Sequence, residues 1–333
     1  MLKIKMVNTT KILLIPPILI VLIVLAFAPQ LLGIYYLSVL RDVLMWTALS
    51  LSWHFFSGLT KYISLGSAAF FGTGWYFAAK YLESSVTNGE YPILPFPVVV
   101  LLAGLVCLAV ALGIGFVTLR LKGIYFAILT FGVTMVLQGI FTWWAVTVTG
   151  TLSTRVPSFS SQTQYYSMLV AMLATLLLTT FLRRSRFGLA LKMIGENEEA
   201  AAHVGVNTSL YKILGFAISA MCMGFVGGSF VTRFTITRPD MAFNTQYSFL
   251  PAVMTMLGGG VTVFGPIIGS VTLTLLWDYL QITFSYYFQI ILGSILVVIV
   301  LFMPNGIVGM VQKLKATRLI GRKEPAKAPK MPP

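Results

Sequence analysis

The clearest candidate for chemistry in this chain is a short polar segment, Glu198-Glu199-Ala200-Ala201-Ala202-His203-Val204-Gly205. Its composition predicts a short helix outside the membrane, because carboxylates in a first turn interact favourably with the helix dipole. Gly205 stands where such a helix would end, a position that favours glycine. Ala200, Ala201 and Val204 would share one small apolar face, which suits docking in a groove on a partner protein. A solvated connecting helix explains the pattern equally well.

Small and hydroxyl-bearing residues within long apolar runs form a second group of candidates. Such residues let helices pack closely, or they leave room for a solute. The stretch from Ser64 to Gly74 predicts a helix with one small face. The stretch from Gly258 to Pro266 predicts a break, and non-helical backbone at membrane depth must be buried in protein or line an aqueous cavity. The residues predicted to line a path are Ser64, Gly66, Ser67, Thr130, Gly132, Thr134, Gly258, Gly259 and Gly260.

The residues that enzymes use are missing or scattered. The sequence contains no G-x-x-x-x-G-K-[ST] loop for nucleotide phosphates. His54 and His203 lie far apart, without a nucleophile and a carboxylate in the order of a triad. Cys107 and Cys222 have no metal-ligand spacing and are expected to pack as small apolar residues. We therefore expect no catalytic residue, no metal site and no cofactor in this chain.

Few ionisable residues lie within the apolar runs, where a charge at a helix centre costs about 2.5–3.5 kcal/mol. Arg41, Asp42 and Asp278 are near segment ends, so we expect them to reach the interface or to pair between helices. His54 is deeper and is expected to hydrogen-bond another helix. No pair of acidic residues suggests a proton relay, which counts against an ion-coupled carrier. That carrier and a non-transporting assembly protein remain open as interpretations of the chain.

The composition explains where these elements must sit. Of 333 residues 57% are hydrophobic and 10% are charged, whereas soluble domains carry about 25% charged residues. Lipid is the solvent that suits such a chain. The net charge of +14 does not indicate nucleic acid, because Lys and Arg gather at the ends of the apolar runs. The fold class predicted is all-α, a polytopic membrane helix bundle.

A membrane helix needs about 20 apolar residues, and nine apolar segments approach that length. With both chain ends on one side, the number of crossings must be even. Because Gly258-Gly259-Gly260 divides one long segment, we expect ten spans, with eight as the alternative. Residues 1–310 would form one membrane domain with a loop at 183–212, and residues 311–333 a basic tail. The segments are 12–28, 36–58, 62–82, 96–119, 123–147, 165–182, 211–233, 249–280 and 284–303.

The basic residues orient the bundle. Lysine and arginine are enriched on the cytoplasmic side of membrane proteins. If the two termini, the turns at Lys61 and at Arg120/Lys122, and the 183–212 loop face the cytoplasm, that side holds 18 of the 23 basic residues. The first segment is expected to be retained as a span, because Pro16-Pro17 interrupts it and no small-x-small cleavage site follows. The opposite side keeps Arg41, Lys80, Arg155, Arg233 and Arg238.

Glu199-Ala200-Ala201 followed by Gly205 resembles the E-A-A-x-x-x-G motif of permease subunits in ATP-binding-cassette importers. From about residue 40 to residue 310 the chain resembles the LivM type of branched-chain amino-acid permease. The matching motifs are Ala48-Leu49-Ser50-Leu51 through Gly58, Ser64-Leu65-Gly66, Ala68-Ala69-Phe70-Phe71-Gly72, Arg120-Leu121-Lys122-Gly123-Ile124-Tyr125-Phe126-Ala127-Ile128, Met256-Leu257-Gly258-Gly259-Gly260, Gly265-Pro266, Gly269 and Met303-Pro304-Asn305-Gly306-Ile307.

The resemblance implies a multi-pass permease of the bacterial inner membrane that forms half of a translocation path. Its partners would be a second, LivH-like permease, two cytoplasmic ATPases and an extracytoplasmic solute-binding protein. ATP and Mg would be bound by the ATPases. The coupling helix that seats in an ATPase would comprise Glu198, Glu199, Ala200, Ala201 and Gly205.

The chain departs from the family pattern where solute would be chosen. Lys61-Tyr62 replaces a Gly-Gln pair, and Ser67 replaces a His. The stretch Thr130–Met135 lacks the family's acidic residue, and Thr151–Arg155 replaces a glycine-rich stretch. The coupling motif also lacks a downstream Pro. The expected solute is a branched-chain or other amino acid, and urea or a short amide is the alternative.

Overall fold

The computed structural model describes residues 23–87, 94–260, 262–302, 306 and 309. The start of the first predicted membrane segment, the predicted basic tail and the motif residues Met303, Pro304 and Asn305 lie outside the described residues. Helix dominates the rest of the chain, as the sequence predicts. Residues 23–31 are helical, and the later elements in chain order are α2 (Ile34–Trp53), η1 (His54–Gly58), α3 (Ser67–Thr87), α4 (Phe96–Thr118), α5 (Ile124–Thr147), β1 (Thr154–Arg155), α6 (Ser161–Arg184), α7 (Arg186–Glu196), α8 (Glu198–His203), α9 (Thr208–Phe230), η2 (Val231–Arg233), β2 (Ile236–Thr237), α10 (Pro239–Ala242), α11 (Gln246–Gly258), α12 (Phe264–Thr283) and α13 (Phe288–Phe302).

Within the described part of the chain, five helices are long and apolar enough to cross a membrane: α2 with η1, α4, α5, α6, and α9 with η2. The polytopic helical class is therefore confirmed. Helices α4 and α5 lie within one residue of the predicted segments 96–119 and 123–147. Helices α11 and α13 are only 13 and 15 residues long, so the count of ten spans stays a prediction.

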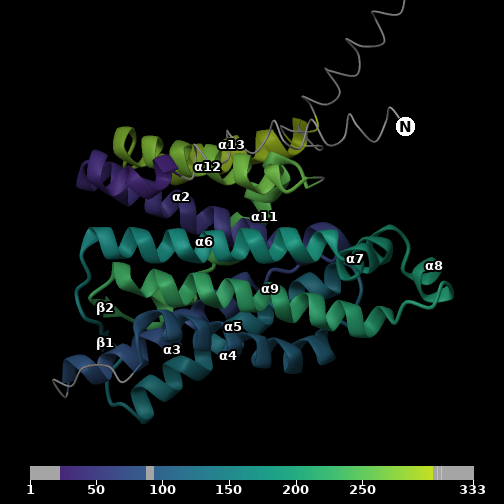
Figure 1. The fold of residues 1–333 in the computed structure, drawn as a ribbon, viewed down its shortest axis with the longest axis horizontal. Helices are drawn as coiled ribbons and strands as arrows, with labels where there is room; N and C mark the ends of the chain where they lie inside the picture. The colour runs from purple at the N-terminus through teal and green to yellow at the C-terminus, as the bar shows by residue number, and fades with distance from the viewer. Residues whose placement is uncertain (1–22, 88–93, 261, 303–305, 307–308, 310–333) are drawn as a thin grey trace, which may run out of the picture.

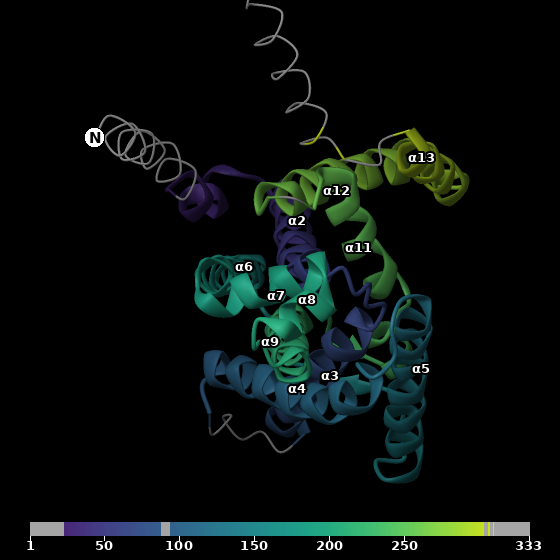
Figure 2. The same ribbon diagram turned by 90° about the vertical axis from the view of Figure 1, so that its right-hand side faces the viewer.

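Helix α9 forms the centre of the bundle. It packs against α3 and α4 on one side and against α2 and α6 on the other, and α11, α12 and α13 form a further layer beyond α2 (Figures 1 and 2). Close backbone approach makes this packing possible: a Cβ on Gly227 of α9 would lie 2.0 Å from the carbonyl oxygen of Phe71 of α3. Gly74 of α3 meets the backbone of Gly224 in the same way. Small residues therefore serve helix packing here, as membrane interfaces commonly require.

The bundle has two chemically distinct ends. At one end β1 pairs with β2 antiparallel, and Arg233 contacts Asp42 there, with two N–O distances of 2.8 Å. At the other end the chain turns through α7 and α8 (Figure 1). Basic residues predicted to face the cytoplasm meet at this second end, since Lys122 and Lys212 both approach Glu198. The side of the membrane that each end faces stays a prediction.

Two predicted segments are interrupted. The stretch 249–280 divides into α11 and α12 as expected, because Gly259 adopts a φ of 102° that ends α11. The prediction of a helix over 62–82 is wrong at its start, since residues 61–66 are non-helical and α3 begins at Ser67. Hydroxyl groups of Ser57 and Thr130 accept hydrogen bonds from the N–H groups of Ser64 and Leu65, in place of the missing helical ones.

Candidate functional site

The loop between α6 and α9 folds as two consecutive short helices. Three polar residues divide it, because each accepts a hydrogen bond from a backbone N–H in the next helix. Ser185 caps α7 through Gly188, Asn197 caps α8 through Ala200 (3.0 Å), and Asn207 caps α9. The sequence therefore predicts the short helix at Glu198–His203 correctly, whereas it gave no expectation for α7.

Helix α8 ends at Gly205 in a backbone conformation that favours glycine. Gly205 has a φ of 91°, and its N–H donates to the carbonyl of Ala202 while the N–H of Val206 donates to that of Ala201. These two bonds form a Schellman motif, in which glycine avoids the strain that a side chain would suffer. These backbone hydrogen bonds fix the end of α8.

The exposed face of α8 differs from the one predicted. Ala201 is buried against the protein, so it does not share a free face with Ala200 and Val204. Glu199 and Ala200 are exposed, and Val204 is 74% exposed. The surface available to a partner is therefore Glu199, Ala200, Ala202, His203, Val204 and Gly205.

Glu198 points the other way, into the protein. Its Oε1 accepts a hydrogen bond of 2.6 Å from Lys212 Nζ, and its Oε2 accepts one of 2.5 Å from the Tyr62 hydroxyl. Lys212 Nζ also donates to the Tyr62 oxygen at 3.2 Å. Lys122 Nζ approaches the same carboxylate at 4.0 Å. We call Tyr62, Glu198 and Lys212 the inner triad, which joins α8 to the start of α9 and to the non-helical segment 61–66.

The other members of the inner triad stabilise the charged form of Glu198. Burial by itself would raise the pKa of Glu198, but hydrogen bonds from Lys212 and Tyr62 and the charges of Lys212 and Lys122 outweigh it and lower the pKa. The carboxylate therefore stays ionised at neutral pH. The Lys212 side chain is only 5% exposed, so its ammonium group depends on Glu198 for a counter-charge.

The segment 61–66 is held by side-chain hydroxyls. Ser57 Oγ accepts from the Ser64 N–H at 3.2 Å, and Thr130 Oγ1 accepts from the Leu65 N–H at 3.0 Å. The Ser64 carbonyl accepts from the indole N–H of Trp53 at 2.7 Å. Irregular backbone at membrane depth requires such internal partners. Ser64 and Thr130 were predicted to line a path, and here they support the segment's backbone.

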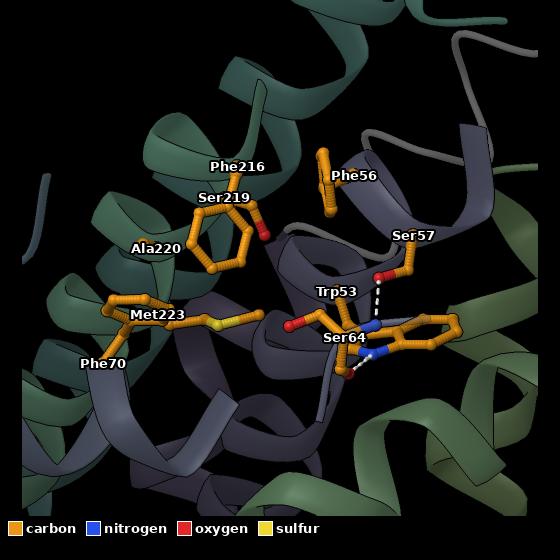
Figure 3. Close-up of a pocket in the computed structure, with 9 residues that line it drawn as sticks. All are labelled: Trp53, Phe56, Ser57, Ser64, Phe70, Phe216, Ser219, Ala220 and Met223. Atoms are coloured by element: carbon orange, nitrogen blue, oxygen red, sulfur yellow. Dashed lines mark hydrogen bonds between the residues drawn. The ribbon is translucent and has the colours of Figure 1, made fainter. Parts of the chain in front are cut away.

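A narrow internal crevice lies beside this segment. Figure 3 shows Ser57 and Ser64 on one side of it and Ser219, Ala220 and Met223 of α9 on the other. Phe56, Phe70 and Phe216 close it with their rings. Between these side chains there is no room for a water molecule, so the crevice is closed in this conformation.

The other predicted path residues fall into separate places. Gly66 and Ser67 join Ser64 and Thr130 at the start of α3, where the Ser67 hydroxyl is buried without a hydrogen-bond partner among the described residues. Thr134 is buried one turn further along α5, and its hydroxyl bonds the Thr130 carbonyl. Gly132 lies outside this group, because a Cβ there would meet no atom of the described residues within 4 Å.

The glycines after α11 occupy a second junction. A Cβ on Gly258 would lie 1.7 Å from the carbonyl oxygen of Gly265, so α11 and α12 meet there backbone to backbone. Gly259 provides the left-handed turn, and Gly260 is exposed. The glycines therefore allow α11 and α12 to form a tight helical hairpin. Their place in a solute path stays a prediction.

Other sequence expectations concern single side chains. His54 bonds Arg183 of α6 at 2.8 Å, which confirms a link between helices. Arg41 bonds Gln164 of α6, and Asp278 accepts from the Tyr35 hydroxyl, so these charges also pair between helices. Sequence reasoning missed Tyr62 and Lys212 as partners of Glu198. Tyr62 stands out only as a departure from the family pattern, and it is 136 positions from Glu198.

Comparison with known proteins gives one consistent result. A family profile described as "Branched-chain amino acid transport system / permease component" matches residues 35–301. The chain is 27% identical over 299 residues to the high-affinity branched-chain amino acid transport system permease protein LivM of Salmonella typhimurium, a match covering 79% of this chain and 68% of LivM. It is 25% identical over 285 residues to LivM of Escherichia coli, covering 76% and 65%.

A shorter match involves a second kind of permease. The chain is 32% identical over 146 residues to the permease protein LivH of Escherichia coli, covering 42% of this chain and 46% of LivH. The matches therefore span about two thirds of the LivM relatives and less than half of LivH. No solved structure matches the chain.

Proposed function

The chain belongs to the family of branched-chain amino-acid transport permease components, and from this premise we propose that it forms half of the translocation path of an ATP-driven importer. It is a transport subunit of the inner membrane. Similarity to both LivM and LivH supports a transporter with two different permease subunits. The remaining partners in this proposal are two ATPases, which bind ATP and Mg, and an extracytoplasmic binding protein.

The observation that carries the proposal is the geometry of α8. This helix stands at one end of the bundle with Glu199, Ala200 and Val204 exposed, while Glu198 and Ala201 anchor it from behind. An exposed valine beside alanines gives a small apolar surface that fits a groove on another protein. In the proposed importer this surface seats in an ATPase on the cytoplasmic side, and both termini lie on that side.

The crevice supports an amino acid as solute. Phe56, Phe70, Phe216 and Met223 offer apolar surface, and serine hydroxyls stand beside them. This mixture suits a small zwitterion with an aliphatic side chain, whereas urea would leave the apolar surface without a partner. We propose that branched-chain amino acids pass through this region when the crevice opens.

The test uses the complete transporter, with both permeases, the ATPases and the binding protein in vesicles. Wild type should take up radiolabelled leucine only when ATP is inside, and unlabelled isoleucine or valine should compete while urea should not. Glu199→Lys combined with Gly205→Val should abolish both co-purification of the ATPases and uptake. Persistence of both in the double variant would exclude α8 as the coupling helix.

The control and the rival outcomes are equally specific. Glu196→Gln changes an exposed carboxylate of the same loop, whose pair with Lys192 is solvent-exposed, and should leave uptake unchanged. Uptake that collapses with an ion gradient and survives ATP depletion would identify an ion-coupled carrier instead. Competition by urea but not by leucine would overturn the proposed solute.

A further inference from the structure

The inner triad lies between the proposed coupling helix and the segment that borders the crevice. We propose that Tyr62, Glu198 and Lys212 form a latch that transmits movement of α8 to the non-helical segment 61–66 and so opens or closes the crevice. The inference rests on the proposed function, because it assigns to that transporter a way of coupling ATP hydrolysis to solute movement. Glu198 then has a role different from that of its neighbour Glu199.

The contacts make a continuous mechanical connection. Glu198 is the first residue of α8, and its two carboxylate oxygens are taken by different partners, Lys212 at 2.6 Å and Tyr62 at 2.5 Å. Lys212 closes the triangle through its bond to the Tyr62 oxygen and lies 4.8 Å from the centre of the Tyr62 ring. Hydrogen bonds to charged groups are stronger than neutral ones. A displacement of α8 therefore pulls directly on Tyr62.

Tyr62 belongs to the part of the chain that borders the crevice. Two residues beyond it, Ser64 lines the crevice and is bonded to Ser57 and Trp53, which line it as well (Figure 3). This backbone carries no helical hydrogen-bond ladder between Lys61 and Gly66. Its side-chain hydrogen bonds can be exchanged one by one, whereas a helix would have to move as a whole.

Helices α6 and α7 contact the helical stretch that precedes segment 61–66 at two other points. Gly195 of α7 packs on the carbonyl of Leu59, where a built Cβ would lie 2.0 Å from the oxygen. Arg183 at the end of α6 bonds His54, the first residue of η1. Short π-turns inside helices occur frequently at functional sites. Helices α6 and α7 thus contact His54 in η1 and Leu59 just after it, and the inner triad holds the segment that follows.

The decisive measurement is the number of solute molecules imported per ATP hydrolysed by the complete transporter. Tyr62→Phe removes one hydroxyl and keeps the ring, and Glu198→Gln removes the charge at nearly constant shape. Tyr62→Phe, whose position lies outside α8, should keep ATPase co-purification and ATP hydrolysis within about twofold of wild type. Uptake per ATP should fall roughly tenfold, as loss of a charge-assisted hydrogen bond can do.

A double-mutant cycle separates a latch from general damage. Tyr62→Phe and Glu198→Gln together should reduce uptake per ATP little more than either alone, because both remove the same connection. Glu196→Gln, the matched carboxylate change on α7, should leave the ratio unchanged. Unaltered uptake per ATP in Tyr62→Phe and Glu198→Gln would overturn the latch.

Loss of ATPase co-purification in Tyr62→Phe would also overturn the latch, since Tyr62 would then act in docking or folding. These outcomes are distinct from failure of the proposed function. If the wild-type transporter does not import leucine with ATP, the proposed function fails first. If wild type imports and the two variants match it, only the latch fails.

Discussion

Gly195 of α7 lies directly against the backbone of Leu59, so closely that a Cβ would sit 2.0 Å from the Leu59 carbonyl oxygen. Because the contact is made with backbone atoms, no side chain can rotate to make room for a Cβ. Any residue larger than glycine must therefore push α7 away from Leu59, the residue that directly follows η1. This contact ties the loop that carries α8 to the membrane-embedded part of the chain.

Gly195→Ala should destabilise the protein by about 1–3 kcal/mol, the usual cost of overpacking a tight contact. Thermal unfolding of the purified protein in detergent measures the effect. Gly139→Ala in α5 is the matched control, because in the described part of the chain no atom lies within 4 Å of a Cβ there. This variant should leave the melting temperature unchanged or raise it. Equal melting temperatures for the two variants would contradict the contact.

The opposite end of the bundle contains a pairing that can be tested in the same way. Asp42 accepts two contacts of 2.8 Å from Arg233 and one of 3.2 Å from Arg41, which is 8% exposed. Asp42→Asn leaves Arg41 without its carboxylate and should cost about 2–4 kcal/mol. Asp240→Asn removes an exposed partner of Arg238 and should cost much less. Equal decreases in melting temperature for Asp42→Asn and Asp240→Asn would show that the Asp42 pair stabilises the protein no more than an exposed pair does.

The stability that Glu198 contributes should depend on pH in one direction. Its pKa is lowered from the ordinary value of 4.5 by the hydrogen bonds and charges that outweigh its burial. The folded protein therefore gains from the carboxylate fully above about pH 4.5 and loses that gain as the pH falls through the lowered pKa. The melting-temperature difference between wild type and Glu198→Gln should stay constant from pH 8 to pH 5.5 and vanish only below pH 4.5. A difference that disappears near pH 6 would mean that the pKa is raised.

The orientation of the chain can be measured with a membrane-impermeant maleimide. Cys107 and Cys222 are both fully buried, so the unmodified protein should give almost no labelling. A Val204→Cys variant should react only in inside-out vesicles, and Asp240→Cys only in right-side-out ones. Labelling of Val204→Cys from the outer face would place α8 where no cytoplasmic ATPase could reach it.

Much of the site on α8 could be predicted from the sequence, because its determinants are local. Acidic residues at a helix start and a glycine at its end act through the backbone of the same few residues, and the structure confirms a helix ending before Gly205. The predicted face was wrong at Ala201, because burial depends on what the rest of the chain places beside it. No local sequence pattern indicates which residues will pack against Ala201.

Composition and segment length alone determined that this is a polytopic helical membrane protein. A long apolar segment in lipid can satisfy all of its backbone hydrogen bonds within itself only as a helix. Family membership followed from motifs spread over most of its length. The tertiary structure decided that Glu198 faces Tyr62 and Lys212, and that residues 61–66 leave the helix. Both depend on hydroxyl and charged partners far away in the chain, and a local pattern cannot specify which distant group will satisfy a buried polar atom.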